Sequence, residues 1–229
     1  FVDKEEEWSH IDWENPDQEK IKEFCKKMLA YNVKLCPTMV VLDQPMKYPD
    51  FWSPKNIVIE SASKINYMMD YWKEHTEIID ILKSSSAKIN NFTKAVAKIY
   101  YDMGGTVVAG SDTPAFVYTY PGMALHRELE LFVEIGFTEL EALQAATVNA
   151  AKSINLHEIG SIKEGKIADL VILNNNPLEN IKHTQDIEFI VKGGKVYNQQ
   201  EILDTAPSEE EVNKSMQDFI DKWEAVNVN

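Results

Sequence analysis

The sequence has 229 residues and a formal net charge of −14, with 44% hydrophobic and 26% charged residues. This composition excludes a disordered polyampholyte, and the apolar runs are far shorter than the ~20 residues of a membrane span. The chain has one arginine, Arg127, and no basic run, which excludes nucleic-acid binding through clustered positive charge. Most of the negative charge lies in residues 1–19 and 201–229, so the intervening body is almost neutral.

Apolar side chains recur at three- and four-residue spacing in six stretches, which predicts amphipathic helices. These stretches cover residues 16–31, 65–82, 89–103, 122–134, 139–154 and 209–223. Asn15 is expected to cap the first helix, and three serines at 84–86 are expected to separate the second from the third. Thr138 and Glu141 form a capping-box pattern that opens the fifth helix.

Two strand patterns lie between the predicted helices, and further strand patterns follow the fifth helix. Residues 33–42 are rich in β-formers, with Pro37 marking a bend or strand end. Residues 106–112 begin with small and β-branched side chains without alternation, which indicates a strand buried on both faces, as in parallel sheets covered by helices. A further strand is expected at 167–173, and Gly193-Gly194 suits the type I′ turn of a hairpin.

Asp112 is the strongest candidate for a catalytic residue on position alone. It ends the buried strand 106–112, and α/β enzymes place their reacting groups at the carboxyl ends of parallel strands. The alternative is that Asp112 only makes a turn or caps a helix after the strand.

Several blocks of the sequence, in this order, resemble the closing third of the amidohydrolase superfamily, especially its imidazolonepropionase-like and prolidase-like members. The blocks are Ala109-Gly110-Ser111-Asp112-Thr113, Leu125-His126-Arg127-Glu128-Leu129, the helix over 141–151, Gly160-Ser161-Ile162, the stretch 164–171 and the stretch 191–196. A single Gly-Ser-Asp-Thr motif is weak support for this resemblance, whereas four blocks in the right order are strong support. The resemblance is dense over 105–197 and weaker over 20–42.

The resemblance implies an α/β fold: the C-terminal half of a TIM (β/α)8 barrel over 1–155, with its last strand near 106–112, and part of a small β-sandwich over 156–204. The resemblance does not cover the C-terminal helix over 205–229, which the capping-box pattern of Ser208 and Glu211 predicts. It also implies one or two divalent metals, usually zinc, and hydrolysis of an amide or cyclic amide C–N bond in a small molecule or dipeptide. Asp112 would then be a metal ligand and the acceptor of the proton from the attacking metal-bound water. Metal-bound water with a lowered pKa and an adjacent carboxylate make this chemistry sensible.

The sequence departs from the family pattern in its length and its histidines. A complete barrel takes ~250 residues, and none of the five histidines has the His-x-His spacing of the family's first metal-binding strand. We therefore expect the chain to correspond to a C-terminal fragment that binds no metal and has no activity by itself. Unpaired barrel strands in such a fragment are expected to drive self-association.

Four further residues are candidates for contact with the substrate or with the residues that hold it. His126 and Arg127 lie about a turn into the helix after Asp112; the alternative for His126 is a helix-edge residue packed on the loop 113–121. Tyr118 and Tyr120 lie in that loop and either shape an apolar substrate pocket or simply cover the core.

Two other functions stay open. A deaminase of the same superfamily uses a similar aspartate, although the sandwich-like segment 160–197 favours amide hydrolysis. A domain that kept the fold but serves only in binding or assembly is the second alternative. Neither the compartment nor the substrate follows from the sequence.

Overall fold

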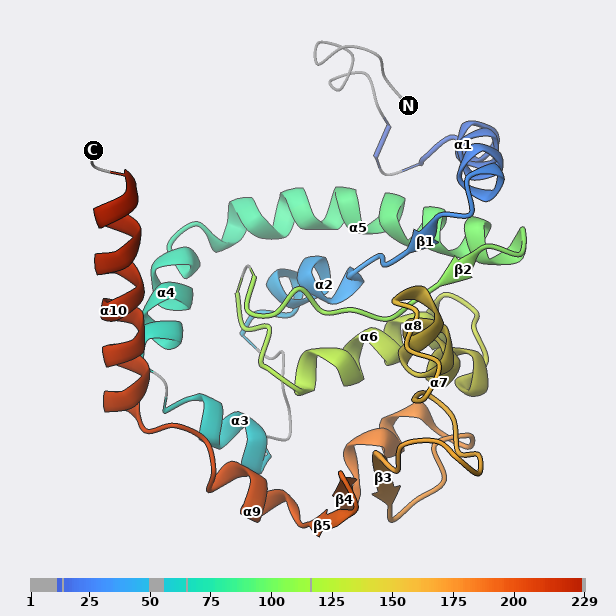
Figure 1. Ribbon diagram of the computed structural model, residues 1–229. Coiled ribbons are helices and arrows are strands. Elements are labelled where there is room, and N and C mark those ends of the chain that lie inside the picture. Colours follow the sequence, from blue (N-terminus) through green and yellow to red (C-terminus); the bar gives the residue numbers. More distant parts are fainter. Residues whose placement is uncertain (1–11, 14, 50–55, 65, 116, 228–229) are drawn as a thin grey trace.

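A computed structural model describes residues 12–227 except 14, 50–55, 65 and 116. Residues 1–11 of the predicted barrel portion therefore lie outside the described residues. The first part of the described chain is helical, with one pair of short parallel strands inside it, and a small antiparallel sheet follows (Figure 1). No helix of the described part has both the length and the hydropathy needed to span a membrane.

The described residues of the helical part form eight α-helices and two strands. In chain order they are α1 (Gln18–Ala30), β1 (Lys34–Leu35), α2 (Met39–Lys47), α3 (Ile57–Ala62), α4 (Asn66–Thr76), α5 (Ile79–Asp102), β2 (Thr106–Val107), α6 (Met123–Glu134), α7 (Glu139–Ala146) and α8 (Val148–Ser153). Strands β1 and β2 pair in parallel, with Lys34 opposite Thr106 and Leu35 opposite Val107. The prediction of two parallel strands is confirmed at these positions, although each strand is shorter than its pattern suggested.

The prediction of a strand over residues 33–42 is wrong beyond residue 35. Helix α2 begins at Met39, directly after Thr38, whose left-handed φ of 45° turns the chain, and Thr38 provides no side-chain cap. Instead, the Glu128 carboxylate accepts hydrogen bonds from the backbone N–H groups of Met39 and Val40. A carboxylate from another helix therefore supplies the cap that a β-rich local sequence lacks.

Two details of the helix predictions are also corrected. Helix α1 is capped by Asp17 rather than Asn15, since the Asp17 carboxylate accepts from the N–H groups of Glu19 and Lys20. The serines at 84–86 do not end a helix, because α5 continues through them and the Ser85 hydroxyl donates to main-chain oxygens one turn earlier. The capping box of Thr138 and Glu141 is confirmed at the start of α7.

The C-terminal part contains a three-stranded antiparallel sheet and the last helices. Its elements are β3 (Leu170–Leu173), the 3-10 helix η2 (Ile181–Gln185), β4 (Ile187–Lys192), β5 (Lys195–Tyr197), α9 (Gln199–Leu203) and α10 (Glu209–Asn227). The predicted hairpin is confirmed, since Gly193 and Gly194 both have positive φ between β4 and β5. The N–H of Gly193 donates to the carboxylate of Asp169, the residue directly before β3, and this bond ties the turn between β4 and β5 to the start of β3.

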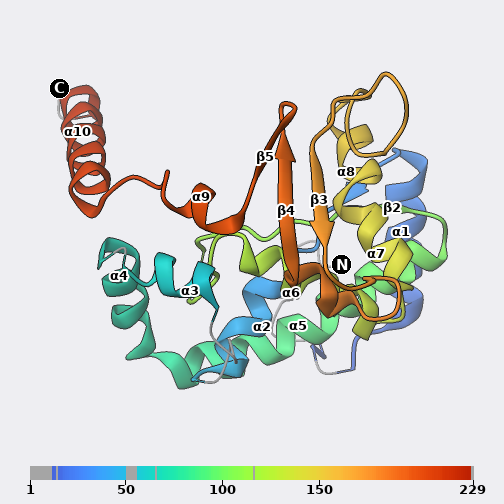
Figure 2. The same cartoon turned by 90° about the horizontal axis from the view of Figure 1, so that it is seen from below.

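One hydrophobic core joins the helices around the parallel strands. Helices α2 and α5 pack closely, and α1, α6 and α7 complete the core with the buried side chains of Ile21, Met39, Tyr100, Leu131, Phe132 and Ala145. Strand β1 is also tied to α5, because the Tyr100 hydroxyl donates to the Val33 carbonyl oxygen at 2.6 Å. Helix α10 lies at the opposite end of the molecule from α1 (Figure 2).

Candidate functional site

Asp112 lies in the turn that follows strand β2. Its side chain is exposed, and its φ of 47° is in the left-handed region, which aspartate tolerates better than most residues. The Asp112 carbonyl oxygen accepts a hydrogen bond from the N–H of Ala115 at 2.7 Å, closing the turn. The carboxylate therefore lies in the loop after the carboxyl end of β2, five residues beyond Val107. The sequence predicted that Asp112 ends the strand itself, which is wrong because the pairing of β2 with β1 stops at Val107.

The turns after β1 and β2 meet beside this carboxylate. Gly110 packs so closely on Cys36 that a Cβ atom at residue 110 would overlap the Cys36 Sγ atom. Burial, and then the negative charges of Glu128 and Asp112, raise the pKa of the Cys36 thiol. The thiol is thus kept protonated, which opposes its use as a nucleophile, since catalytic cysteines need a lowered pKa.

The contact between Gly110 and Cys36 gives a direct test of this arrangement. We expect Gly110→Ala to lower the free energy of unfolding by about 1–3 kcal/mol, because the new methyl group overfills the junction. Cys36→Ala should be nearly neutral alone and should restore most of the loss in the double variant. Urea denaturation of the four proteins measures the coupling, and additive effects of the two substitutions would contradict the contact.

Glu128 is the buried carboxylate that holds the segment after β1 in place. Its residue is fully buried, and its oxygens accept from the N–H groups of Met39 at 3.1 Å and Val40 at 2.7 Å. Burial raises the pKa of Glu128 to about 8, although the two backbone hydrogen bonds oppose this. This role was not predicted from the sequence. The available signal was that Glu128 lies on the same helix face as the apolar residues Ala124, Leu131 and Phe132, which indicates burial.

Arg127, the neighbour of Glu128, forms the centre of a largely buried ion-pair network. Its guanidinium binds both Asp43 oxygens, at 2.8 and 3.0 Å, and also contacts Glu130 at 2.9 Å and Glu134 at 2.6 Å. Because these carboxylates surround it, the pKa of Arg127 is raised despite burial. All the partners that the structure gives Arg127 are protein carboxylates, so its assignment to the substrate stays a prediction.

His126 faces η2 and the antiparallel sheet. Its Nδ1 atom lies 2.9 Å from the Thr184 hydroxyl oxygen, and burial lowers the pKa of the imidazole. The ring lines a pocket whose wall includes residues of β4 and α9 and does not include Asp112. The structure therefore gives His126 partners on the side of the antiparallel sheet, and its contact with a substrate stays a prediction.

Tyr118 and Tyr120 pack into a second hydrophobic cluster around α3 and α4. Both rings contact Trp72, with centroid distances of 5.3 and 5.0 Å, and the Trp72 indole N–H donates to the Pro114 carbonyl oxygen. Burial raises the pKa of Tyr118. These contacts favour the alternative in which the loop covers a core, and a role in a substrate pocket remains a prediction.

Comparison with known families identifies the scaffold. Residues 14–198 match the amidohydrolase family. The chain belongs to the amidohydrolase family. Among curated amidohydrolase relatives, it is 36% identical over 126 residues to an ochratoxinase of Aspergillus niger, covering 51% of this chain and 25% of the relative. It is 34% identical over 128 residues to an imidazolonepropionase of a Geobacillus species, covering 52% of this chain and 29% of the relative. The chain thus spans about a quarter of the length of these relatives.

Solved structures agree with this assignment at the level of the fold. A Xaa-Pro dipeptidase with methionine in its active site superposes with a TM-score of 0.56 at 21% identity, covering 77% of this chain and 37% of that protein. A prolidase complexed with N-methylphosphonate-L-proline gives 0.53 at 24% identity, covering 80% and 38%. The mixed α/β structure of this amidohydrolase is consistent with part of a barrel.

Amidohydrolases are generally metal-dependent, so a metal site would need several ligating side chains close together among the described residues. They contain no group of three or more His, Cys, Asp and Glu side chains placed to bind an ion. Near Asp112, the oxygens of Glu128 are already engaged by two backbone N–H groups. Among the described residues, Asp112 is therefore not accompanied by the further ligands that the metal site implied by the family requires.

Proposed function

We propose that this amidohydrolase hydrolyses an amide or cyclic amide C–N bond in a small molecule, and that Asp112 is its catalytic carboxylate. The observation that supports this most directly is the exposed Asp112 side chain in the loop that follows the carboxyl end of β2, within the segment that matches the family. Enzymes with parallel strands place their reacting groups at this end.

We further propose that the reaction uses a bound metal ion. In the complete enzyme, Asp112 would be a ligand of one or two divalent ions, with zinc as the expected metal, and would accept the proton of the attacking water. The described residues supply this aspartate without the other ligands, so we propose that histidines from outside the described part of the chain complete the site. The 229 residues alone are then expected to retain well under one zinc per chain after dialysis.

Hydrolysis by the whole gene product that contains these residues tests the proposal. With added Zn²⁺, we expect turnover of at least one member of a panel of dipeptides, cyclic imides and imidazolone rings. Asp112→Asn should lower kcat/KM by about 10³-fold or more, because the amide cannot accept a proton. Mass spectrometry of the products distinguishes C–N hydrolysis of an amide from deamination.

Asp80→Asn is the matched control, because Asp80 is also exposed but lies in the first turn of α5. Its activity should equal that of the unmodified protein. Zinc-dependent turnover that survives Asp112→Asn would contradict the role of Asp112. Absence of turnover on the whole panel by a folded, zinc-loaded protein would favour the binding or assembly alternative.

A further inference from the structure

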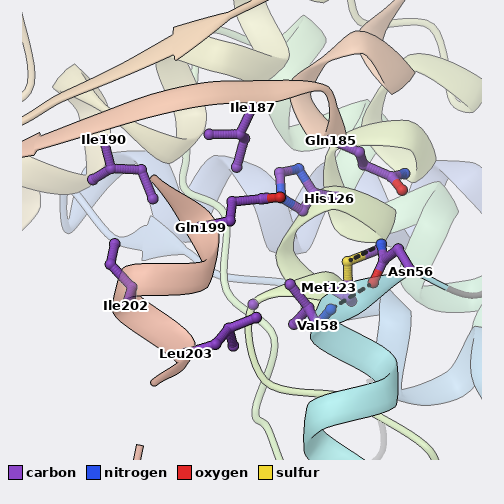
Figure 3. A pocket seen from close by; sticks show the side chains of 11 residues that line it. Asn56, Val58, Met123, His126, Gln185, Ile187, Ile190, Gln199, Ile202 and Leu203 are labelled. Carbon is purple, nitrogen blue, oxygen red and sulfur yellow. Dashed lines mark hydrogen bonds between the residues drawn. The ribbon is translucent and has the colours of Figure 1, made fainter. Parts of the chain in front are cut away.

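A pocket of about 140 Å³ lies where the start of α6 meets α3, β4 and α9 (Figure 3). Its walls are largely aliphatic, with Val58, Met123, Ile187 and Ile202 among the 11 lining residues. None of the described residues that line it is an aspartate, glutamate, lysine or arginine. A pocket with such walls favours an uncharged apolar ligand, because nothing in it compensates the desolvation of a charge.

His126 is the polar side chain that could form a hydrogen bond with a ligand in this pocket. The Thr184 hydroxyl donates its hydrogen to the Ile181 carbonyl oxygen at 2.8 Å, so its oxygen must accept from His126. The proton of the imidazole therefore sits on Nδ1, and burial, which lowers the pKa, favours this neutral ring. Nε2 is then a hydrogen-bond acceptor, and none of the described residues donates to it.

The size of the pocket limits the ligand to roughly one ring. An apolar cavity of about 150 Å³ in another protein holds one benzene molecule, so 140 Å³ suits a single six-membered ring. Gln199 also lines the pocket, and its amide has no hydrogen-bond partner among the described residues. Figure 3 shows the Gln199 side chain extending toward the His126 ring, with Ile187 nearby, so polar and aliphatic parts of the wall adjoin.

We propose that this pocket binds a neutral, ring-sized apolar molecule with one hydroxyl or N–H donor, such as a phenol, and that the donor bonds to Nε2 of His126. The aliphatic side chains surround the ring, and the imidazole nitrogen selects for the donor. This site does not depend on the chemistry proposed for Asp112, because Asp112 is not among its lining residues.

Binding of phenol and toluene to the 229-residue chain, followed by ligand-observed NMR and calorimetry, tests the proposal. The two probes have nearly the same shape, but only phenol carries a donor. We expect saturable 1:1 binding of phenol, and binding of toluene that is about tenfold weaker or more, since toluene displaces water from the half-buried His126 acceptor and leaves it unpaired. Equal affinity for the two probes, or no saturable binding of phenol, would overturn the proposal.

Three variants locate the site. His126→Phe should weaken phenol binding about tenfold and change toluene binding little, which removes the selectivity. Ile202→Trp should abolish binding of both probes by filling the pocket, and retained phenol binding in this variant would place the site elsewhere and overturn the proposal. His157→Phe is the control at an exposed histidine and should leave both affinities unchanged. If His126→Phe fails to fold, the selectivity of the unmodified chain and the Ile202→Trp result still decide the matter.

Discussion

Replacement of Arg127 by methionine is expected to lower the free energy of unfolding by about 3–5 kcal/mol, the usual cost of removing one partner of a buried ion pair. Arg127 and Asp43 are both more than nine-tenths buried, and the guanidinium contacts both oxygens of the Asp43 carboxylate. Methionine fills similar space but leaves that carboxylate buried without a cation. Glu130 loses its cation as well and keeps only the hydrogen bond from the Gln185 amide, whereas half-exposed Glu134 can be solvated.

Urea denaturation monitored by circular dichroism measures this effect. The matched control is Lys98→Met, which removes the exposed ion pair of Lys98 with Asp102 and should cost at most about 1 kcal/mol. Arg127→Lys keeps the charge but loses the two-pronged contact, so it should fall between the two.

A double variant distinguishes two costs of replacing Arg127: the cost of leaving the Asp43 carboxylate buried without a cation, and the loss of the ion pair itself. Asp43→Leu combined with Arg127→Met replaces the buried pair by apolar side chains, and we expect it to recover much of the stability lost in Arg127→Met. Strict additivity of the two substitutions, or a change below about 1 kcal/mol for Arg127→Met, would show that the network does not stabilise the fold as its geometry implies.

The sequence predicted those elements whose determinants are close together in the chain. Thr138 and Glu141 are three residues apart, so their reciprocal hydrogen bonds could be anticipated, and the helix begins there. Gly193 and Gly194 determine their turn in the same local manner. The placement of Asp112 after a parallel strand followed likewise from the pattern before it, although β2 ends at Val107 and not at residue 112.

Features that depend on distant partners could not be predicted in this way. Helix α2 starts at Met39 because of a glutamate 89 residues further on, whereas the local sequence favours a strand. Arg127 was a candidate for substrate contact because nothing in its own helix reveals that Asp43 lies 84 residues earlier and within reach. Polar side chains on helix faces were therefore assigned correctly to a helix, but their partners required the tertiary structure.

Glu128 should also make the stability of the protein depend on pH in an unusual direction. Burial raises the pKa of its carboxyl from 4.5 to about 8 in the folded protein, and the unfolded chain has the ordinary value. Between these values the folded state binds a proton that the unfolded state has lost. The contribution of Glu128 is therefore most favourable below about pH 4.5 and is lost as the pH rises toward 8, with a slope of at most about 1.4 kcal/mol per pH unit.

Glu128→Gln removes this titration while keeping one oxygen that can accept from the start of α2. Unfolding by urea at several pH values from 5 to 9 should show a decline in stability for the unmodified chain and a flatter profile for Glu128→Gln. The control is Glu188→Gln, at an exposed glutamate in β4, whose profile should follow that of the unmodified chain. Parallel profiles for the unmodified chain and Glu128→Gln would mean that Glu128 is ionised throughout this range. In that case, the positive end of α2 and its two N–H groups would outweigh the effect of burial on this carboxylate.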